Sequence, residues 1–475
     1  MKVSKSLGRS MRGSWLPYLL RTFAIFVGLL WGSHVVSFGE QRFPPPEFES
    51  GYELPATQIP LPRSVAAQMV DVAVLVAALG VACFLVFKKR SRRGVIALSV
   101  FSLLYFGFYR KGCVCSIGSL QNVALGLANS AYAVPIVVTA FFVLPLAVAL
   151  FAGRAFCAGV CPHGALQDLL LLKPVRVPAW LEQGLSVVPF LYLGAGVWFA
   201  ASGSAFIICE YDPFVPIFRL SGSFFILSVA AVFLVASLFI GRPYCRFLCP
   251  YGALLKMASS VSKWRIRVTP DVCTQCRLCE DSCPHGALRE PVVVSGRGTA
   301  SVGGWKLSWI VLPVVILLAA WAGSRLGMVA AGVNPTVRLA DQFLLTTGER
   351  ADIRGANRTA ESLALRRVGE NPAEVLQAAA DIRGRFVSGG WFFGAWVALV
   401  LGVKWLLVGS VPKRTDYEPA NGSCFACARC FEFCPNELLR RGVSPAVSAA
   451  PQEGSLFEGA RRIPEKGDRS TACRP

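Results

Sequence analysis

The chain has 475 residues, of which 54% are hydrophobic and 16% are charged, and its formal net charge is +20. Soluble domains carry roughly 25% charged residues, so the composition excludes an ordinary soluble protein and favours one that crosses a membrane several times. Lys and Arg residues that fix topology on the cytoplasmic side account for the positive excess, so nucleic acid is not expected as a partner.

Apolar runs predict about eight membrane helices, since each is long enough or nearly long enough to cross a bilayer. A basic N-terminal segment precedes the first run, which lacks a clear cleavage site and is predicted to be retained. The Lys and Arg content of the connecting segments places both termini in the cytoplasm. The predicted fold class is an all-α polytopic membrane protein with runs near 15–37, 66–87, 95–110, 131–152, 185–207, 222–241, 305–323 and 386–409.

Two cysteine runs have the spacing C-x-x-C-x-x-C-x-x-x-C-P, which is typical of bacterial ferredoxins. Three cysteines at two-residue gaps wrap one cluster, and the fourth is directed toward a neighbouring cluster. Structural zinc sites usually use two C-x-x-C pairs that are roughly a dozen or more residues apart. The runs therefore predict two 4Fe-4S clusters with the ligands Cys273, Cys276, Cys279 and Cys283, and Cys424, Cys427, Cys430 and Cys434.

A shorter motif, C-x-x-x-C-P, occurs twice, each time after an apolar run and a Gly-Arg pair. Its cysteines are Cys157 and Cys161 in the first unit and Cys245 and Cys249 in the second. If the two units pack as a pseudo-symmetric pair, the four thiolates converge on one further iron–sulfur or metal centre. The alternative is that these are turn cysteines without a metal. A looser copy of the same unit runs from Cys115 to Gln121.

Three cysteines, Cys113, Cys115 and Cys209, are predicted on the outer side of the membrane. They fit a redox-active disulfide, ligands of an outer redox centre or a plain stabilising disulfide, and the sequence leaves these alternatives open. His163 and His285, which follow Cys-Pro, are predicted to make hydrogen bonds in loops. Asp71 lies inside an apolar run near its end and is predicted to extend toward the interface.

The two C-x-x-x-C-P units, Phe156–Asp168 and Tyr244–Leu255, followed by ferredoxin runs, resemble the NosR/NapH-type membrane polyferredoxins. The resemblance covers roughly residues 130–290 and reaches the last run by motif. It implies an integral protein of the bacterial inner membrane that transfers electrons in respiratory chains, with two 4Fe-4S clusters on the cytoplasmic side. NosR-like members also carry a periplasmic flavin domain, for which the outer segment 37–65 is too short.

The sequence divides into six segments. They are 1–130 with three helices and an outer C-x-C loop, 131–268 with the two C-x-x-x-C-P units, 269–292 with the first ferredoxin run, 305–409 as a membrane hairpin with a long outer loop, 420–440 with the second ferredoxin run, and 441–475 as a disordered tail.

The predicted function is to relay electrons between a cytoplasmic or quinone donor and a membrane or periplasmic redox partner. The alternative is an assembly or maturation factor that keeps a partner's metal or thiols reduced. No substrate site is evident, so we expect a component of an oxidoreductase system whose partners are membrane lipid and redox proteins.

Overall fold

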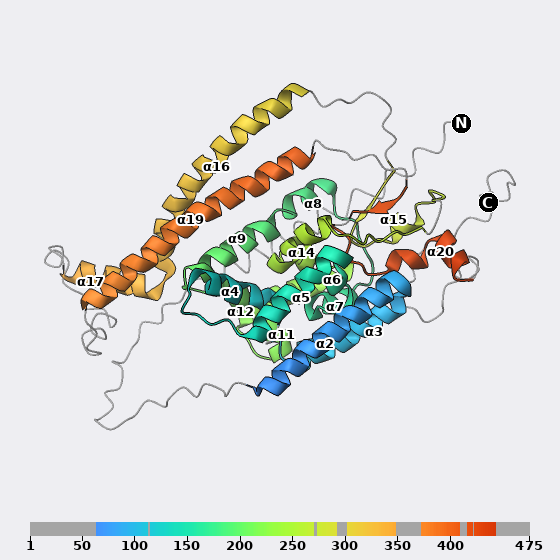
Figure 1. Cartoon of the computed structure of the whole chain (residues 1–475), viewed down its shortest axis with the longest axis horizontal. Coiled ribbons are helices and arrows are strands. Elements are labelled where there is room, and N and C mark those ends of the chain that lie inside the picture. Colours follow the sequence, from blue (N-terminus) through green and yellow to red (C-terminus); the bar gives the residue numbers. More distant parts are fainter. Residues whose placement is uncertain are drawn as a thin grey trace. The chain divides into compact units, whose positions relative to one another are not determined.

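The computed structural model describes residues 63–112, 115–269, 273–291, 302–347, 372–408, 416–420 and 422–442. The predicted first helix, Cys113 and the predicted disordered tail beyond residue 442 lie outside this part of the chain. The described residues are mostly helical (Figure 1), in agreement with the predicted fold class.

Four helical segments in the described residues are long and apolar enough to cross a membrane, namely Val65–Lys88, Ala179–Ala201, Val311–Val333 and Ala373–Leu406. Two further apolar helices, Ile136–Ala152 and Phe224–Phe239, are shorter. The predicted run 95–110 is helical but is not among the four spans. The total of about eight spans therefore stays a prediction.

The longer helices of the core are α2 (Val65–Cys83) with its π-helical continuation η1 (Phe84–Lys88), α3 (Arg92–Ser102) with η2 (Leu103–Tyr109), α4 (Ser116–Ala128), α5 (Ile136–Ala152), α9 (Val188–Ala201), α12 (Phe224–Phe239) and α14 (Pro250–Ser260). Shorter helices between them are α6 (Ala155–Gly159), α7 (Pro162–Leu169), α8 (Ala179–Leu185), α10 (Ile207–Glu210), α11 (Val215–Arg219) and α13 (Pro243–Phe247). Among the longer helices of the core, α5, α9 and α12 are apolar on all sides, as expected for helices that meet lipid or each other.

The predicted internal repeat is present as two matching helical units, α5–α6–α7 and α12–α13–α14. In each unit an apolar helix ends at a Gly-Arg pair, a five-residue helix follows, and a proline begins the third helix. Proline is suited to the first helical position because its missing N–H would have no partner there. The cysteine before that proline is the N-cap residue in both units.

The hairpin α16 (Val302–Ala330) and α19 (Pro372–Val408) is packed through glycines, with η3 (Ala331–Val333) and α17 (Pro335–Thr347) between them in the chain. The two long helices run side by side (Figure 1). A Cβ added to Gly323 would lie 2.2 Å from the carbonyl oxygen of Gly390, and one added to Gly394 would lie 2.0 Å from that of Ala319. Such small residues at four-residue spacing let helix backbones approach closely.

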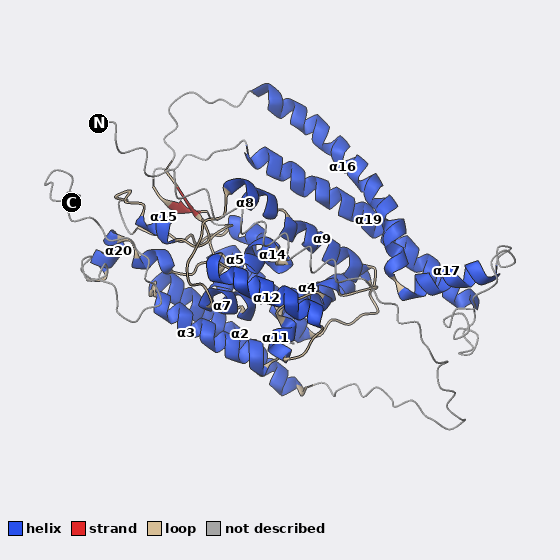
Figure 2. Ribbon diagram, turned by 180° about the vertical axis from the view of Figure 1, so that it is seen from behind, coloured by secondary structure: helices blue, strands red, loops and turns tan. Residues whose placement is uncertain are grey.

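The two ferredoxin runs are adjacent although the hairpin separates them in the sequence. They form α15 (Leu278–Ser282), η5 (Arg429–Glu432) and α20 (Pro435–Arg440), and a small sheet joins them (Figure 2). Its strands β1 (Leu288–Arg289) and β2 (Glu418–Pro419) pair antiparallel, with Leu288 opposite Pro419.

Asp71 does not extend toward an interface, so that prediction is wrong. Its side chain is only 1% exposed. It forms ion pairs with Arg110 at 2.9 Å and Arg63 at 3.3 Å and accepts a hydrogen bond from the Tyr105 hydroxyl at 2.9 Å. These donors compensate the burial of the carboxylate, which would otherwise be costly.

The hairpin packing predicts that Gly390→Ala destabilises the protein, because the new Cβ would lie 2.3 Å from the Gly323 carbonyl oxygen. Overpacking of this kind costs about 1–3 kcal/mol. The matched control is Gly384→Ala in the same helix, where no atom lies within 4 Å of the added Cβ. Thermal unfolding in detergent should show a lower midpoint for the first variant alone, and equal midpoints would contradict this packing.

Candidate metal centres

The two ferredoxin runs share a pattern of positive φ angles. Residues two and four positions after the first cysteine have positive φ angles in both: Gln275 (+53°) and Arg277 (+63°), and Ala426 (+55°) and Ala428 (+61°). Non-glycine residues rarely adopt such angles. The shared pattern turns backbone N–H groups inward, which creates a concave surface suited to an anionic group.

The first group of thiols combines cysteines from both runs. Cys279 and Cys434 are buried in one small cluster with Val268, Leu288 and Tyr417. Burial raises the pKa of Cys279 to about 12, and the neighbouring thiols of Cys276, Cys434 and Cys273 add to the effect. The fourth cysteine of the second run thus lies beside the first three of the first run.

The second group shows the reciprocal exchange. Burial raises the pKa of Cys430 well above its usual value, and Cys424, Cys427 and Cys283 raise it further. Burial is the main cause of the raised pKa values of Cys424 and Cys427, and Cys283 raises both further. The fourth cysteine of the first run therefore lies beside the first three of the second, and the β1–β2 pair holds the runs in this arrangement.

Phe425 joins the second group to the helical core. The Arg154 guanidinium lies 4.0 Å from the centroid of the Phe425 ring, and the His285 ring lies 4.7 Å away. Nearby, Arg92 donates a hydrogen bond to the Cys427 carbonyl at 3.1 Å. Cation–π contacts with a buried ring are worth about 2 kcal/mol, so this side of the ferredoxin segment is held firmly against the core.

The four cysteines of the C-x-x-x-C-P units lie together, as the sequence predicted. Cys161 and Cys249 cap α7 and α14, and Cys157 and Cys245 precede them in α6 and α13. Each is only 6–8% exposed. All four line one cavity whose other walls are largely apolar and include Leu75, Phe106, Phe141 and Tyr251.

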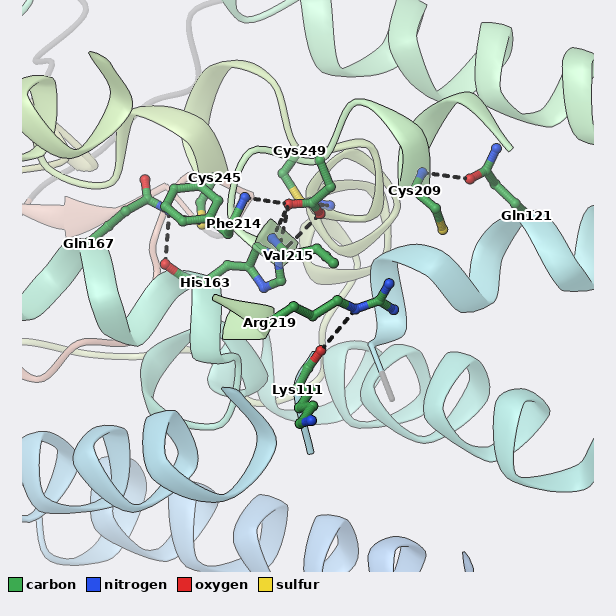
Figure 3. A network of polar contacts seen from close by, with 12 residues as sticks. Lys111, Gln121, His163, Gln167, Cys209, Phe214, Val215, Arg219, Cys245 and Cys249 are labelled. Atoms are coloured by element: carbon green, nitrogen blue, oxygen red, sulfur yellow. Dashed lines mark hydrogen bonds and ion pairs between the residues drawn. The ribbon is translucent and has the colours of Figure 1, made fainter. Parts of the chain in front are cut away.

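Hydrogen-bond donors face the sulfurs of this group. The Gly252 N–H donates to Cys249 Sγ at 3.2 Å, and Gln167 Nε2 donates to Cys245 Sγ at 3.3 Å. Figure 3 shows Gln167, Cys245 and Cys249 close together. Hydrogen bonds to thiolate sulfur raise the reduction potential of a bound cluster because they stabilise added negative charge.

The arginine of each Gly-Arg pair packs against the C-x-x-x-C-P motif of the other unit. Arg242, which precedes the second unit, is fully buried and donates hydrogen bonds to the carbonyls of Cys157 and Ala158 in the first. A Cβ on Gly164 would lie 3.3 Å from Arg242 Nη1, and one on Gly252 would lie 3.2 Å from Arg154 Nη2. The glycine three residues after each capping cysteine thus makes room for the arginine of the other unit.

The carboxylate of Asp168 compensates the buried positive charge of Arg242. Its carboxylate lies 2.8 Å from Arg92 Nη2 and 3.1 Å from Arg242 Nη2. Burial by itself would raise the pKa of Asp168, but Arg242 and Arg92 hold that pKa below the usual range. The carboxylate is therefore ionised and holds both guanidinium groups in place.

The donor set fits an iron–sulfur cluster. Burial raises the pKa of Cys245 to about 12, so this thiol stays protonated until a metal displaces the proton. No three His, Cys, Asp or Glu side chains in the described residues converge like the ligands of a single metal ion. A cubane cluster instead holds its four thiolates at separate corners, and when bound it supplies one-electron redox chemistry.

Of the cysteines predicted on the outer side, Cys115 lies at this cavity and Cys209 lies beside Gly118 of α4. Cys115 is the N-cap residue of α4 and lines the cavity, and Cys209 lies in the short helix α10. Both are free thiols. Cys113, the third cysteine predicted on the outer side, lies outside the described residues.

Sequence reasoning missed a buried contact between the His163 ring and the Asp212 carboxylate, whose closest atoms are 3.2 Å apart. Asp212 also accepts a hydrogen bond from the Phe214 N–H at 2.8 Å, so it joins helix α7 to the loop after Cys209. The position of His163 directly after Cys-Pro was the available signal, but nothing local identified its partner. His285 makes the predicted loop hydrogen bond, to the Gly241 carbonyl at 3.3 Å.

Comparison with known proteins gives the chemistry of these segments. Residues 134–178 and 223–269, which contain the two C-x-x-x-C-P units, match one model of a 4Fe-4S binding domain, and residues 266–289 match another. No solved structure matches the chain.

Three curated relatives are similar to part of the chain. YccM of Escherichia coli, which is named for electron transport, is 31% identical over 35% of this chain and 52% of its own length. NirI of Paracoccus denitrificans is 36% identical over 29% of this chain and 22% of its own length. The regulatory protein NosR of Pseudomonas aeruginosa is 28% identical over 42% of this chain and 30% of its own length. The chain thus spans about half of YccM and under a third of the other two.

The protein is therefore a mostly helical membrane protein with 4Fe-4S binding domains. Within that class it resembles the NosR/NapH-type membrane polyferredoxins, and the prediction made from its cysteine motifs is confirmed.

The buried network predicts that Asp168→Asn destabilises the protein by about 3–5 kcal/mol, because Arg242 and Arg92 would lose their compensating charge. The control is Asp281→Asn, since Asp281 is exposed and pairs with Arg176 at the surface. Such surface pairs contribute about 0–1 kcal/mol. Thermal unfolding should separate the two variants, and similar midpoints would show that Asp168 does not hold the arginines.

Proposed function

We propose that this protein relays electrons along a series of iron–sulfur centres in the inner membrane of a bacterium. The observation that carries the proposal is the arrangement of its cysteines in three groups, two in the ferredoxin segment and one in the helical core, in which every thiol except the exposed Cys276 is buried or half-buried. The printed name of YccM and the 4Fe-4S binding domains support the same function.

Each ferredoxin cluster takes its fourth ligand from the other run. One cluster would be held by Cys273, Cys276, Cys279 and Cys434, and the other by Cys424, Cys427, Cys430 and Cys283. The proximity of the exchanged thiols supports this assignment, and the same exchange is known in two-cluster bacterial ferredoxins.

The third centre would be held by Cys157, Cys161, Cys245 and Cys249. Arg154 and Phe425 lie between it and the second ferredoxin group, because Arg154 lines the four-cysteine cavity and also contacts the Phe425 ring. An electron that leaves the ferredoxin segment therefore has a short, packed route into the core. The two arginines next to the four sulfurs would also stabilise the extra negative charge of the reduced state.

The order of these centres supports a proposal for the donor and the acceptor. We assign the ferredoxin segment to the cytoplasmic side, where a soluble protein donates electrons, and the far end of the helical core to a membrane or periplasmic acceptor. A quinone is an alternative donor. The maturation function, in which a partner's metal or thiols are kept reduced, uses the same centres and differs only in the acceptor.

EPR of cysteine variants tests the exchanged ligands in the full-length protein. Cys434→Ser should alter the same reduced-cluster signal as Cys276→Ser, and Cys283→Ser should alter the same signal as Cys427→Ser. Cys83→Ser, a free cysteine of α2 outside these groups, is the control and should leave both signals unchanged. Grouping by sequence, with Cys283 affecting the Cys276 signal, would contradict the exchange, and the absence of any iron–sulfur signal would contradict the function.

A further inference from the structure

The segment from Cys115 to Gln121 repeats the unit that begins at Cys161. In both, a cysteine caps a helix, a glycine follows three residues later and a glutamine six residues later. Gln167 accepts a hydrogen bond from the Tyr244 N–H at 3.0 Å and donates one to Cys245 Sγ. Gln121 likewise accepts a hydrogen bond from the Cys209 N–H at 3.1 Å (Figure 3). Cys209 therefore bonds to the glutamine of the Cys115–Gln121 segment, as Tyr244 bonds to the glutamine of the first unit.

Gly118 lies beside the Cys209 sulfur, in the helical turn that begins after Cys115. A Cβ added to Gly118 would lie 3.0 Å from Cys209 Sγ, whereas the corresponding glycines Gly164 and Gly252 face arginines. The backbone amides of Ile117 and Gly118 face the Cys115 sulfur and lower the pKa of this thiol, although burial raises it to about 12 overall. Cys115 and the Cys209 sulfur thus both lie at the first turn of α4.

The Gln121 side chain has an unused donor. Gln121 is fully buried, and its Nε2 has no hydrogen-bond partner in the described part of the chain. In the first unit the corresponding atom of Gln167 bonds to a cysteine sulfur. A buried donor without a partner is costly, so its presence here indicates a site that changes its state or its occupant.

This thiol pair adjoins the four-cysteine group. Cys115 lines the same cavity. The pKa of Cys161 is raised chiefly by burial, then by Cys245 and Cys157, and Cys115 raises it further. Cys209 does not line the cavity and is exposed. The order from the core outward is therefore the four-cysteine group, Cys115 and Cys209.

We propose that Cys115 and Cys209 are a reversible dithiol–disulfide couple that exchanges electrons with the four-cysteine centre. On oxidation the two thiols lose two protons to solvent and two electrons, and an S–S bond forms between the two Sγ atoms. Reduction takes up two electrons and two protons and breaks that bond. The four cysteines of the core, with a cluster bound, would accept and return these electrons one at a time. The couple rests on the proposed function, since that centre is its electron donor and acceptor. It would convert one-electron transfer inside the protein into two-electron thiol chemistry at the exposed Cys209.

Thiol trapping in the full-length protein tests the couple. Protein oxidised with ferricyanide, and protein then reduced anaerobically with methyl viologen radical as a one-electron donor, are alkylated and mapped by mass spectrometry. We expect a Cys115–Cys209 linked peptide in the oxidised sample and two alkylated cysteines after reduction. In Cys157→Ser/Cys245→Ser, reduction by the viologen should be lost, while a phosphine, which reduces disulfides directly, should still open the bond.

Four outcomes would overturn the couple. Cys115 and Cys209 could be alkylated in both samples, or Cys209 could be linked to Cys113. The disulfide could also persist while the iron–sulfur signals are fully reduced, which would make it a structural bridge. Iron loss in Cys115→Ser would instead make Cys115 a cluster ligand and would equally contradict the proposal. Failure of the proposed function is distinct, because the viologen would then reduce no iron–sulfur signal at all.

Discussion

The buried interaction of Arg242 with Asp168 and with the carbonyls of Cys157 and Ala158 is the constraint on which the rest of the structure depends. A guanidinium with no exposed surface destabilises a fold by several kcal/mol unless charge and hydrogen bonds compensate it. Here they do so only when the two C-x-x-x-C-P units pack against each other. The same contact therefore fixes the relative positions of the two cysteine pairs.

That constraint also connects the core to the ferredoxin segment. Asp168 pairs with Arg92, and Arg92 donates to the Cys427 carbonyl. Arg154 performs the equivalent task on the other side, since it contacts both the four-cysteine cavity and Phe425. The positive charges that hold the units together thus lie next to the thiols, where they would compensate the negative charge of a cluster and favour its reduction.

Much of the architecture could be predicted from local patterns. The spacing of each ferredoxin run determines its backbone wrap, and the outward direction of the fourth cysteine is part of the same pattern. The repeat of Gly-Arg, short helix and Cys-Pro could be recognised because both copies are contiguous in sequence. Apolar length identified the helices α2, α9, α16 and α19.

The features that could not be predicted depend on contacts between distant residues. Nothing near Asp71 indicated the arginines and the tyrosine that surround it, and nothing near His163 indicated Asp212. The position of Cys115 at the four-cysteine cavity depends on how α4 packs. Helix length was also misleading, since α5 and α12 are shorter than the apolar runs that predicted them.

We propose that the core holds a third iron–sulfur centre between the ferredoxin clusters and the thiols of Cys115 and Cys209. Anaerobic iron and acid-labile sulfide analysis of the full-length protein and of Cys157→Ser/Cys245→Ser tests it most directly. Three cubane clusters contain about twelve iron atoms and two contain about eight. We expect the higher value for the wild type and the lower value for the variant, with both ferredoxin EPR signals retained. Equal iron contents near the lower value would contradict it and would make the four buried cysteines structural.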